Sequence, residues 1–85
     1  MSNKLENQVK ALVARHFNLP PSKVGLDAAF VGGLGGDALD LIELCYMFEE
    51  AFDILLSPSQ RDSLVSCRDV IGLLRSRGVM AEGRK

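Results

Sequence analysis

The residues most suited to chemistry lie in one stretch, GGLGGDALDLIEL, at positions 32–44. A glycine-rich loop leads to Asp37, and an amphipathic helix is expected to begin at the next residue, Ala38. Aspartate is a favoured N-cap, and Asp40 adds a carboxylate in the first turn, where the helix dipole stabilises negative charge. The free N–H groups of a helix start form an anion site, yet the Ala38 methyl group offers no atom for attachment.

The five residues Gly32-Gly33-Leu34-Gly35-Gly36 could in principle cradle a phosphate, but the pattern is incomplete. It lacks the Lys-Ser/Thr pair of a P-loop, and no strand is expected before it. We therefore interpret the glycines as allowing the chain to approach the helix start closely.

Acidic residues are concentrated in one part of the chain. Residues 1–36 carry four basic and two acidic side chains (+2), residues 37–53 six acidic and no basic ones (−6), and residues 54–85 six basic and three acidic ones (+3). The acidic segment has the wrong sign for nucleic acid, so we expect no nucleic-acid partner.

No catalytic or metal-binding constellation stands out. His16 is the only histidine and has no evident nucleophile or acid as a partner, so we interpret it as a cap near a helix end. The carboxylates of residues 37–53 are expected to face water with ordinary acidity, which argues against a general acid/base pair. They also lack the ligand order of a Ca²⁺ loop, so no metal site is predicted. Cys45 and Cys67 have no metal-ligand spacing and are expected to be buried thiols.

Periodicity and capping signals predict four helices and no strand. The first spans about residues 3–17, and the second about 38–52. A short third helix follows Ser57-Pro58 to about Leu64, and a fourth begins after Ser66 and stops at Gly78. The fold class is therefore all-α, a small four-helix bundle, with one domain at 1–78 and a flexible tail at 79–85.

The connection at residues 20–36 is long for so small a domain, so it should either carry function or be held in place. Five apolar residues are expected to hold it: Val24, Leu26, Phe30, Val31 and Leu34.

The helix at 38–52 is predicted to have two different faces. One is wholly apolar and should belong to the core: Leu41, Leu44, Cys45, Phe48 and Phe52. The opposite face combines large apolar groups with carboxylates: Leu39, Ile42, Glu43, Tyr46, Glu49 and Glu50. Apolar groups ringed by charge indicate a docking surface.

Three segments together carry a resemblance to a known family: FVGGLGGDALD at 30–40, IEL at 42–44, and FEEAFDI at 48–54. The chain resembles an acyl carrier protein essentially without gaps from Leu5 to about Leu74. The resemblance implies a non-enzymatic carrier that holds acyl or polyketide intermediates as thioesters on 4′-phosphopantetheine. In that family the arm is attached to a serine at the start of the second helix, and a cavity among the helices can shelter the cargo.

Carried over position by position, the cofactor site would consist of Asp37, Ala38 and Leu39. The implied partners are a phosphopantetheinyl transferase and acyl-transferring or condensing enzymes with basic docking patches. Their contact set would be Asp37, Leu39, Asp40, Ile42, Glu43, Tyr46, Glu49 and Glu50.

Two departures from the family pattern shape the functional prediction. Ala38 stands at the position of the family's serine, so the chain as written cannot take the prosthetic group by the family's chemistry. Either a native serine was changed to alanine, or this is a natural homologue that no longer carries acyl groups. The second departure is the basic set Arg61, Arg68, Arg75 and Arg77, together with Gly32-Gly33 where acidic residues are common. It favours a specialised secondary-metabolite or lipid pathway over general fatty-acid synthesis.

The function expected from the sequence is thus an acyl carrier protein in an apo-locked form. The alternative is a non-carrying adaptor or regulatory protein that binds a partner through the same helix face. No apolar run is long enough to span a membrane, and the N-terminus has no signal or transit pattern. We expect a cytoplasmic monomer.

Overall fold

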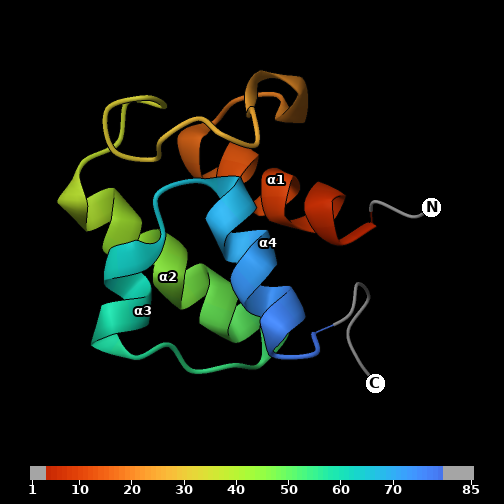
Figure 1. The fold of residues 1–85 in the computed structure, drawn as a ribbon. Helices are drawn as coiled ribbons and strands as arrows, with labels where there is room; N and C mark the ends of the chain where they lie inside the picture. Colours follow the sequence, from red (N-terminus) through yellow and green to blue (C-terminus); the bar gives the residue numbers. More distant parts are fainter. Residues whose placement is uncertain (1–3, 80–85) are drawn as a thin grey trace.

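The computed structural model describes residues 4–79, and in that range the chain is helical (Figure 1). The elements are α1 (Lys4–Phe17), the 3-10 turn η1 (Pro21–Lys23), α2 (Ala38–Phe52), α3 (Pro58–Ser63) and α4 (Cys67–Ser76). The only strand-like pairing within these residues is an isolated bridge between Val31 and Gly36. The predicted all-α bundle with a long first connection and a short third helix is confirmed.

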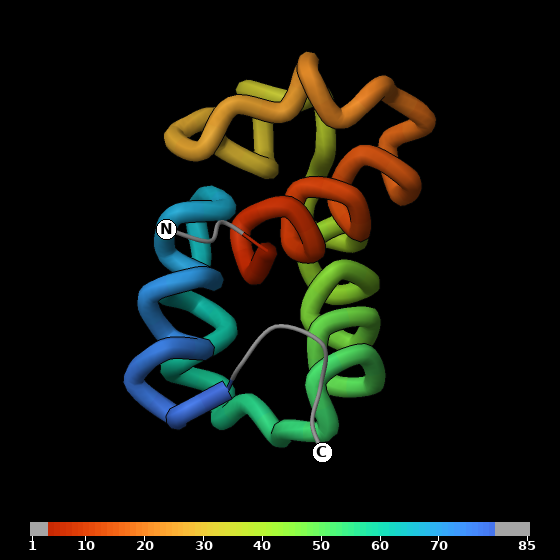
Figure 2. Tube along the Cα trace, turned by 90° about the vertical axis from the view of Figure 1, so that its right-hand side faces the viewer, coloured from red at the N-terminus to blue at the C-terminus, as the bar shows by residue number. Residues whose placement is uncertain are grey.

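The arrangement of the helices places the long connection and the α2–α3 connection at opposite ends of the molecule. α1 packs against both α4 and α2, and Figure 2 shows it between them. The loop before α2 lies across one end of the bundle, where α2 begins. The start and the end of α2 therefore present two separate regions of the surface.

Reciprocal caps set the starts of α2 and α3 where the sequence predicts them. The backbone N–H of Asp40 donates to Asp37 Oδ1 over 3.1 Å, and the Asp37 N–H donates to Asp40 Oδ2 over 2.9 Å. Ser57 and Gln60 make the same pair of bonds at the start of α3, at 3.2 and 2.9 Å. Each pair satisfies N–H groups that a helix start leaves without an intrahelical partner.

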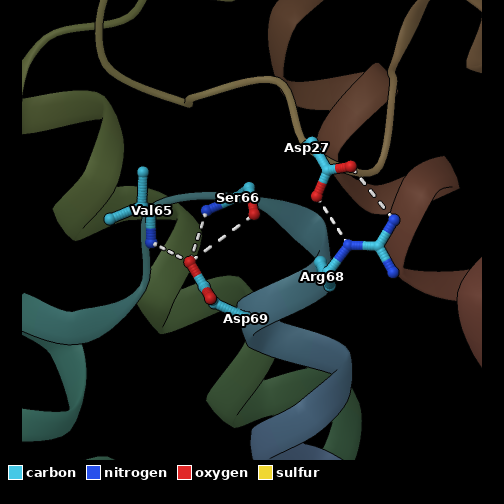
Figure 3. A network of polar contacts seen from close by, with 5 residues as sticks. All are labelled: Asp27, Val65, Ser66, Arg68 and Asp69. Carbon is cyan, nitrogen blue, oxygen red and sulfur yellow. Dashed lines mark hydrogen bonds and ion pairs between the residues drawn. The ribbon is translucent and has the colours of Figure 1, made fainter.

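The start of α4 is held by a carboxylate and tied to the long loop (Figure 3). Asp69 Oδ2 accepts hydrogen bonds from the backbone N–H groups of Val65 and Ser66, at 3.0 and 3.2 Å. One residue earlier, the guanidinium of Arg68 forms a two-pronged ion pair with Asp27 of the loop. The Arg68 guanidinium lowers the pKa of the Asp27 carboxyl, chiefly through this hydrogen bonding.

The core forms where the apolar faces of α1, α2 and α4 meet. From α2 it takes Leu44, Cys45, Phe48 and Phe52, as predicted, whereas Leu41 is only half-buried and packs at its edge. Cys45 and Cys67 are buried free thiols, in agreement with the sequence interpretation. Burial raises the pKa of both thiols, that of Cys67 to about 11, so neither is a ready thiolate.

The long loop is held as expected at four of the five predicted apolar positions. Val24 and Phe30 are fully buried, and Leu26 and Leu34 pack partly buried against the core. The expectation for Val31 is wrong, because its side chain is half exposed. Phe30, the residue before it, takes the buried position instead.

Gly36 permits the close approach that the sequence predicts at the start of α2. A Cβ atom there would lie 2.7 Å from the carbonyl oxygen of Phe30 and 2.8 Å from the ring of Phe17. Only glycine lets the loop pass this close to α1.

The end of α4 also follows the prediction, since the helix stops at Ser76 and Gly78 adopts φ +77°. Val79 packs against the core, and the remaining residues of the expected tail, 80–85, lie outside the described range. No helix in the described part of the chain is both long and apolar enough to cross a membrane.

Candidate docking face and attachment position

The outward face of α2 carries large apolar side chains in water. Leu39, Ile42 and Tyr46 are 61%, 46% and 57% exposed, and the carboxylates of Glu43 and Glu50 are exposed on the same helix. Burial of the three apolar groups would have removed the basis for a docking surface. Their exposure instead confirms that α2 has one face in the core and one in water. That the outer face docks a partner stays a prediction.

Ala38 is the first residue of α2, and its side chain is exposed. Asp37 precedes it in extended backbone with φ −127°, so the chain turns into the helix immediately before Ala38. The N–H groups of the first turn and the positive end of the helix dipole favour an anion at this place. A phosphodiester would fit the surroundings, but Ala38 has no hydroxyl group to bind one covalently.

His16 joins α1 to the first turn of α2, which the sequence interpretation missed. Its Nε2 atom lies 2.9 Å from Asp40 Oδ1 and 3.7 Å from Glu43 Oε1, and its side chain is 12% exposed. The prediction that His16 has no acidic partner is wrong. The two residues of the short pair are 24 positions apart, so no local sequence pattern could have revealed it.

Asp40 does not keep ordinary acidity, contrary to the expectation for the α2 carboxylates. The backbone hydrogen bond from Asp37 lowers the pKa of the Asp40 carboxyl most, and the hydrogen bond with His16 lowers it further. Both contacts stabilise the ionised form. The Asp40 carboxylate therefore both caps α2 and contacts His16 of α1.

His16, Asp40 and Glu43 bring three potential metal-ligand atoms within 4.8 Å of one another. Both oxygens of Asp40 are already engaged, one by His16 and one by the Asp37 N–H. These hydrogen bonds account for the cluster as a contact between helices. The absence of a metal site stays a prediction.

Glu49 has a structural contact that the sequence did not indicate. Its Oε2 atom accepts a hydrogen bond of 2.9 Å from the backbone N–H of Leu56, and its side chain is half-buried. This bond ties the last turn of α2 to the connection that follows. Among the acidic residues assigned to the docking face, Glu43 and Glu50 are more open to a partner.

Two grooves flank the exposed face of α2, and Tyr46 lines both. The first, of about 370 Å³, lies between α2 and α3 and is lined by Leu41, Ile42, Cys45, Tyr46, Pro58, Arg61 and Asp62. The second, of about 610 Å³, lies at the end of α2 and is lined by Tyr46, Glu49, Glu50, Asp53, Ile54 and Leu55.

Comparison with known proteins agrees with this geometry. The family model described as phosphopantetheine attachment site matches residues 7–74. The acyl carrier protein of Akkermansia muciniphila is 35% identical over 72 residues, which are 85% of this chain and 90% of the relative. That of Bdellovibrio bacteriovorus is 32% identical over 84% of this chain and 91% of its own length. That of Phenylobacterium zucineum is 35% identical over 91% of this chain and 96% of its own. With two faces on α2, an exposed helix start and a match over most of its length, the chain belongs to the acyl carrier protein family.

Proposed function

We propose that this chain is an acyl carrier protein in an apo-locked form, with Ala38 at the attachment position. Its framework would hold acyl or polyketide intermediates as thioesters on 4′-phosphopantetheine if that position were serine. With serine at that position it would act as a carrier and not as a catalyst. The observation that carries the proposal is the exposed first residue of α2, beside an intact acidic and apolar face.

The immediate surroundings of Ala38 support this assignment. Asp37 caps the helix, and Leu39 is exposed directly after Ala38. A group attached at the first turn would leave the protein where the loop and α2 meet. The 370 Å³ groove between α2 and α3 lies along the same helix, where part of a cargo chain could rest.

The contact set for partner enzymes is proposed as the sequence analysis assigned it, from Asp37 to Glu50. A phosphopantetheinyl transferase and acyl-transferring or condensing enzymes would approach with basic patches. Charge complementarity of this kind acts mainly on the association rate and on specificity. The open carboxylates Glu43 and Glu50 are the best placed to contribute.

A specialised pathway, and not general fatty-acid synthesis, remains our proposal. The arginines after α2 support it, since they reduce the overall acidity of the chain. Three of them have contacts within residues 4–79: Arg68 pairs with Asp27, Arg75 lies 3.8 Å from Glu6, and Arg77 donates to the Leu55 carbonyl and to Gln60. These arginines therefore make contacts within the fold as well as adding positive charge.

A second candidate function is a non-carrying adaptor that binds a partner through the same face. The observation that favours it is Ala38 itself, because the docking surface does not depend on the arm. The codon in the source gene separates the two candidates. A serine codon in place of the alanine codon would end the adaptor hypothesis.

The decisive experiment restores the missing hydroxyl group. Ala38→Ser protein is incubated with a broad-specificity phosphopantetheinyl transferase and coenzyme A, and its mass is measured. We expect a gain of one phosphopantetheine group, because the helix start and the docking face are already present.

The matched control is the unsubstituted chain, which has Ala38 but retains its other serines, among them Ser57 and Ser59. It should show no change in mass. An Ala38→Ser protein that also stays at its original mass would contradict the carrier proposal.

A further inference from the structure

The groove between α2 and α3 is apolar along most of its lining and charged on the α3 side. Its charged lining residues are Arg61 and Asp62, and the others are Leu41, Ile42, Cys45, Tyr46 and Pro58. Cys45 is only 1% exposed, so it lies at the bottom of the groove. A molecule in this groove would therefore contact carbon on most sides and a cation on one.

Arg61 differs from the other arginines that follow α2, because its guanidinium has no partner in the fold. Within residues 4–79, Arg68 and Arg75 each lie against a carboxylate, and Arg77 donates to a carbonyl and an amide oxygen. The Arg61 side chain has no hydrogen bond or ion pair in that range, although the residue is half-buried. An arginine carries five N–H donors. Those of Arg61 are available to a molecule that enters the groove.

The groove lies on the same side of α2 as the attachment position. Leu41, Ile42 and Cys45 follow Ala38 by three, four and seven residues, and such positions share one side of a helix. At 1.5 Å per residue, Cys45 lies about 10 Å from Ala38 along the helix axis. Burial raises the pKa of the Cys45 thiol, and the Arg61 charge acts in the opposite direction, so the guanidinium lies near this thiol. A chain attached at residue 38 and laid along this side of α2 would therefore reach Arg61.

We propose that Arg61 determines which cargo this groove accepts, and that it favours an acyl chain with a keto oxygen over a plain alkyl chain. The carbons of the cargo would lie against Leu41, Ile42 and Pro58, and the guanidinium would donate a hydrogen bond to the keto oxygen. An alkyl chain would displace water from Arg61 and supply no acceptor, which leaves its donors unsatisfied. The inference rests on the proposed function, because it names the class of cargo that the carrier framework takes.

A cargo that ends in a carboxylate fits the charges of the groove less well. It would pair with Arg61, but it would also meet Asp62, which is exposed and lines the same groove. Residues 37–53, which include all of α2, carry six acidic and no basic side chains, so their field opposes a further negative charge. A neutral keto oxygen accepts a hydrogen bond from Arg61 without this repulsion.

The test attaches cargo at residue 38 without the transferase. The thiolate of an Ala38→Cys chain displaces iodide from an iodoacetamide reagent and forms a thioether to a linker as long as phosphopantetheine. The linker ends in an octanoyl, a 5-oxooctanoyl or a 7-carboxyheptanoyl group, which match in chain length. Cys45 and Cys67 are buried and their pKa values are raised, so the mass should show a single adduct.

We expect the thermal unfolding midpoint of the 5-oxooctanoyl adduct to lie about 4–8 °C above that of the octanoyl adduct, because it gains a hydrogen bond to a charged group. Arg61→Met removes the donors and keeps a long unbranched side chain, so it should abolish or reverse this difference. Arg15→Met is the matched control and should preserve it. Arg15 is an exposed arginine of α1 that lines neither of the two grooves along α2.

A second measurement does not depend on the folding of Arg61→Met. The Nε–H resonance of Arg61 is followed by NMR in the chain that retains Arg61. It should shift in the 5-oxooctanoyl adduct relative to the octanoyl adduct, because only the keto oxygen accepts a hydrogen bond from it. An unchanged resonance would contradict the proposed contact.

Equal midpoints for the octanoyl and 5-oxooctanoyl adducts, or the same difference in Arg61→Met, would overturn this role of Arg61. The highest midpoint in the 7-carboxyheptanoyl adduct would also overturn it, in favour of an anionic cargo. These results leave the carrier proposal standing if Ala38→Ser still gains the phosphopantetheine mass. Failure of that gain would contradict the proposed function, whereas the adducts at Ala38→Cys would still report on the groove.

Discussion

At the residue scale, the side chains of α2 divide between recognition and structure in a way that their types do not reveal. Glu43 and Glu50 are open to solvent, whereas Asp40 contacts His16 and Glu49 accepts the Leu56 N–H. A charge reversal at Asp40 or Glu49 would therefore disturb packing as well as docking. Substitutions that probe partner binding belong at Glu43 and Glu50.

The lowered pKa of Asp40 predicts a pH dependence with a definite sign. Its carboxyl has a lower pKa in the folded chain than the value of about 3.9 expected when unfolded, so folding favours the ionised form. The stability from its contacts is fully present above the unfolded value and is lost as the pH falls through the folded one. We expect Asp40→Asn to lose less stability than the unsubstituted chain on acidification below pH about 4, measured by urea unfolding.

Asp62→Asn on α3 is the control for this titration, since within residues 4–79 its carboxylate has no hydrogen-bond or ion-pair partner. It should follow the unsubstituted chain. Identical acid profiles for all three proteins would mean that the contacts of Asp40 do not favour its ionised form.

At the scale of single elements, the helix limits depend on caps and on a few glycines with different roles. Gly36 lies where a Cβ atom would collide with Phe30 and Phe17, whereas Gly72 lies inside α4 with open space around it. The same substitution should thus have opposite effects at the two positions.

We expect Gly36→Ala to destabilise the protein by about 1–3 kcal/mol, because the loop or the Phe17 ring must move. Gly72→Ala should stabilise it by about 0.5–1 kcal/mol, because alanine is the better helix former in an exposed helix interior. Chemical unfolding of both variants measures the difference. Destabilisation by both substitutions would show that α4 does not tolerate a side chain at Gly72.

At the scale of the whole molecule, the long loop at residues 20–36 covers one end of the bundle, and hydrogen bonds to other segments hold it there. The Phe30 N–H donates to the Val65 carbonyl at 2.8 Å, and the Arg68 N–H donates to the Leu26 carbonyl at 2.9 Å. These bonds connect the loop to the α3–α4 connection and to α4. The loop that leads into α2 is therefore held by two segments that are distant from it in sequence.

Hydrogen exchange should be uneven along this loop. The Phe30 amide is buried and bonded across the fold, so we expect slow exchange, as for the amides of α1, α2 and α4. The Gly33 amide is exposed and has no backbone acceptor among the described residues, so it should exchange quickly. Amide-resolved exchange by NMR measures both. Equal protection throughout residues 20–36 would contradict this description.

The sequence by itself determined the helices, the two faces of α2 and the family, because these depend on local signals. A capping box spans three residues, so the helix starts after Asp37 and Ser57 can be predicted from the sequence. An apolar helix face repeats every three to four residues, so the buried stripe that includes Leu44 and Phe48 can be predicted as well. Only the tertiary structure decided which polar groups remain free for a partner. His16 meets Asp40 across 24 residues, and Arg77 meets Leu55 across 22, because the path of the backbone brings them together. Of the acidic residues assigned to the docking face, Glu43 and Glu50 are exposed and accept no hydrogen bond within residues 4–79.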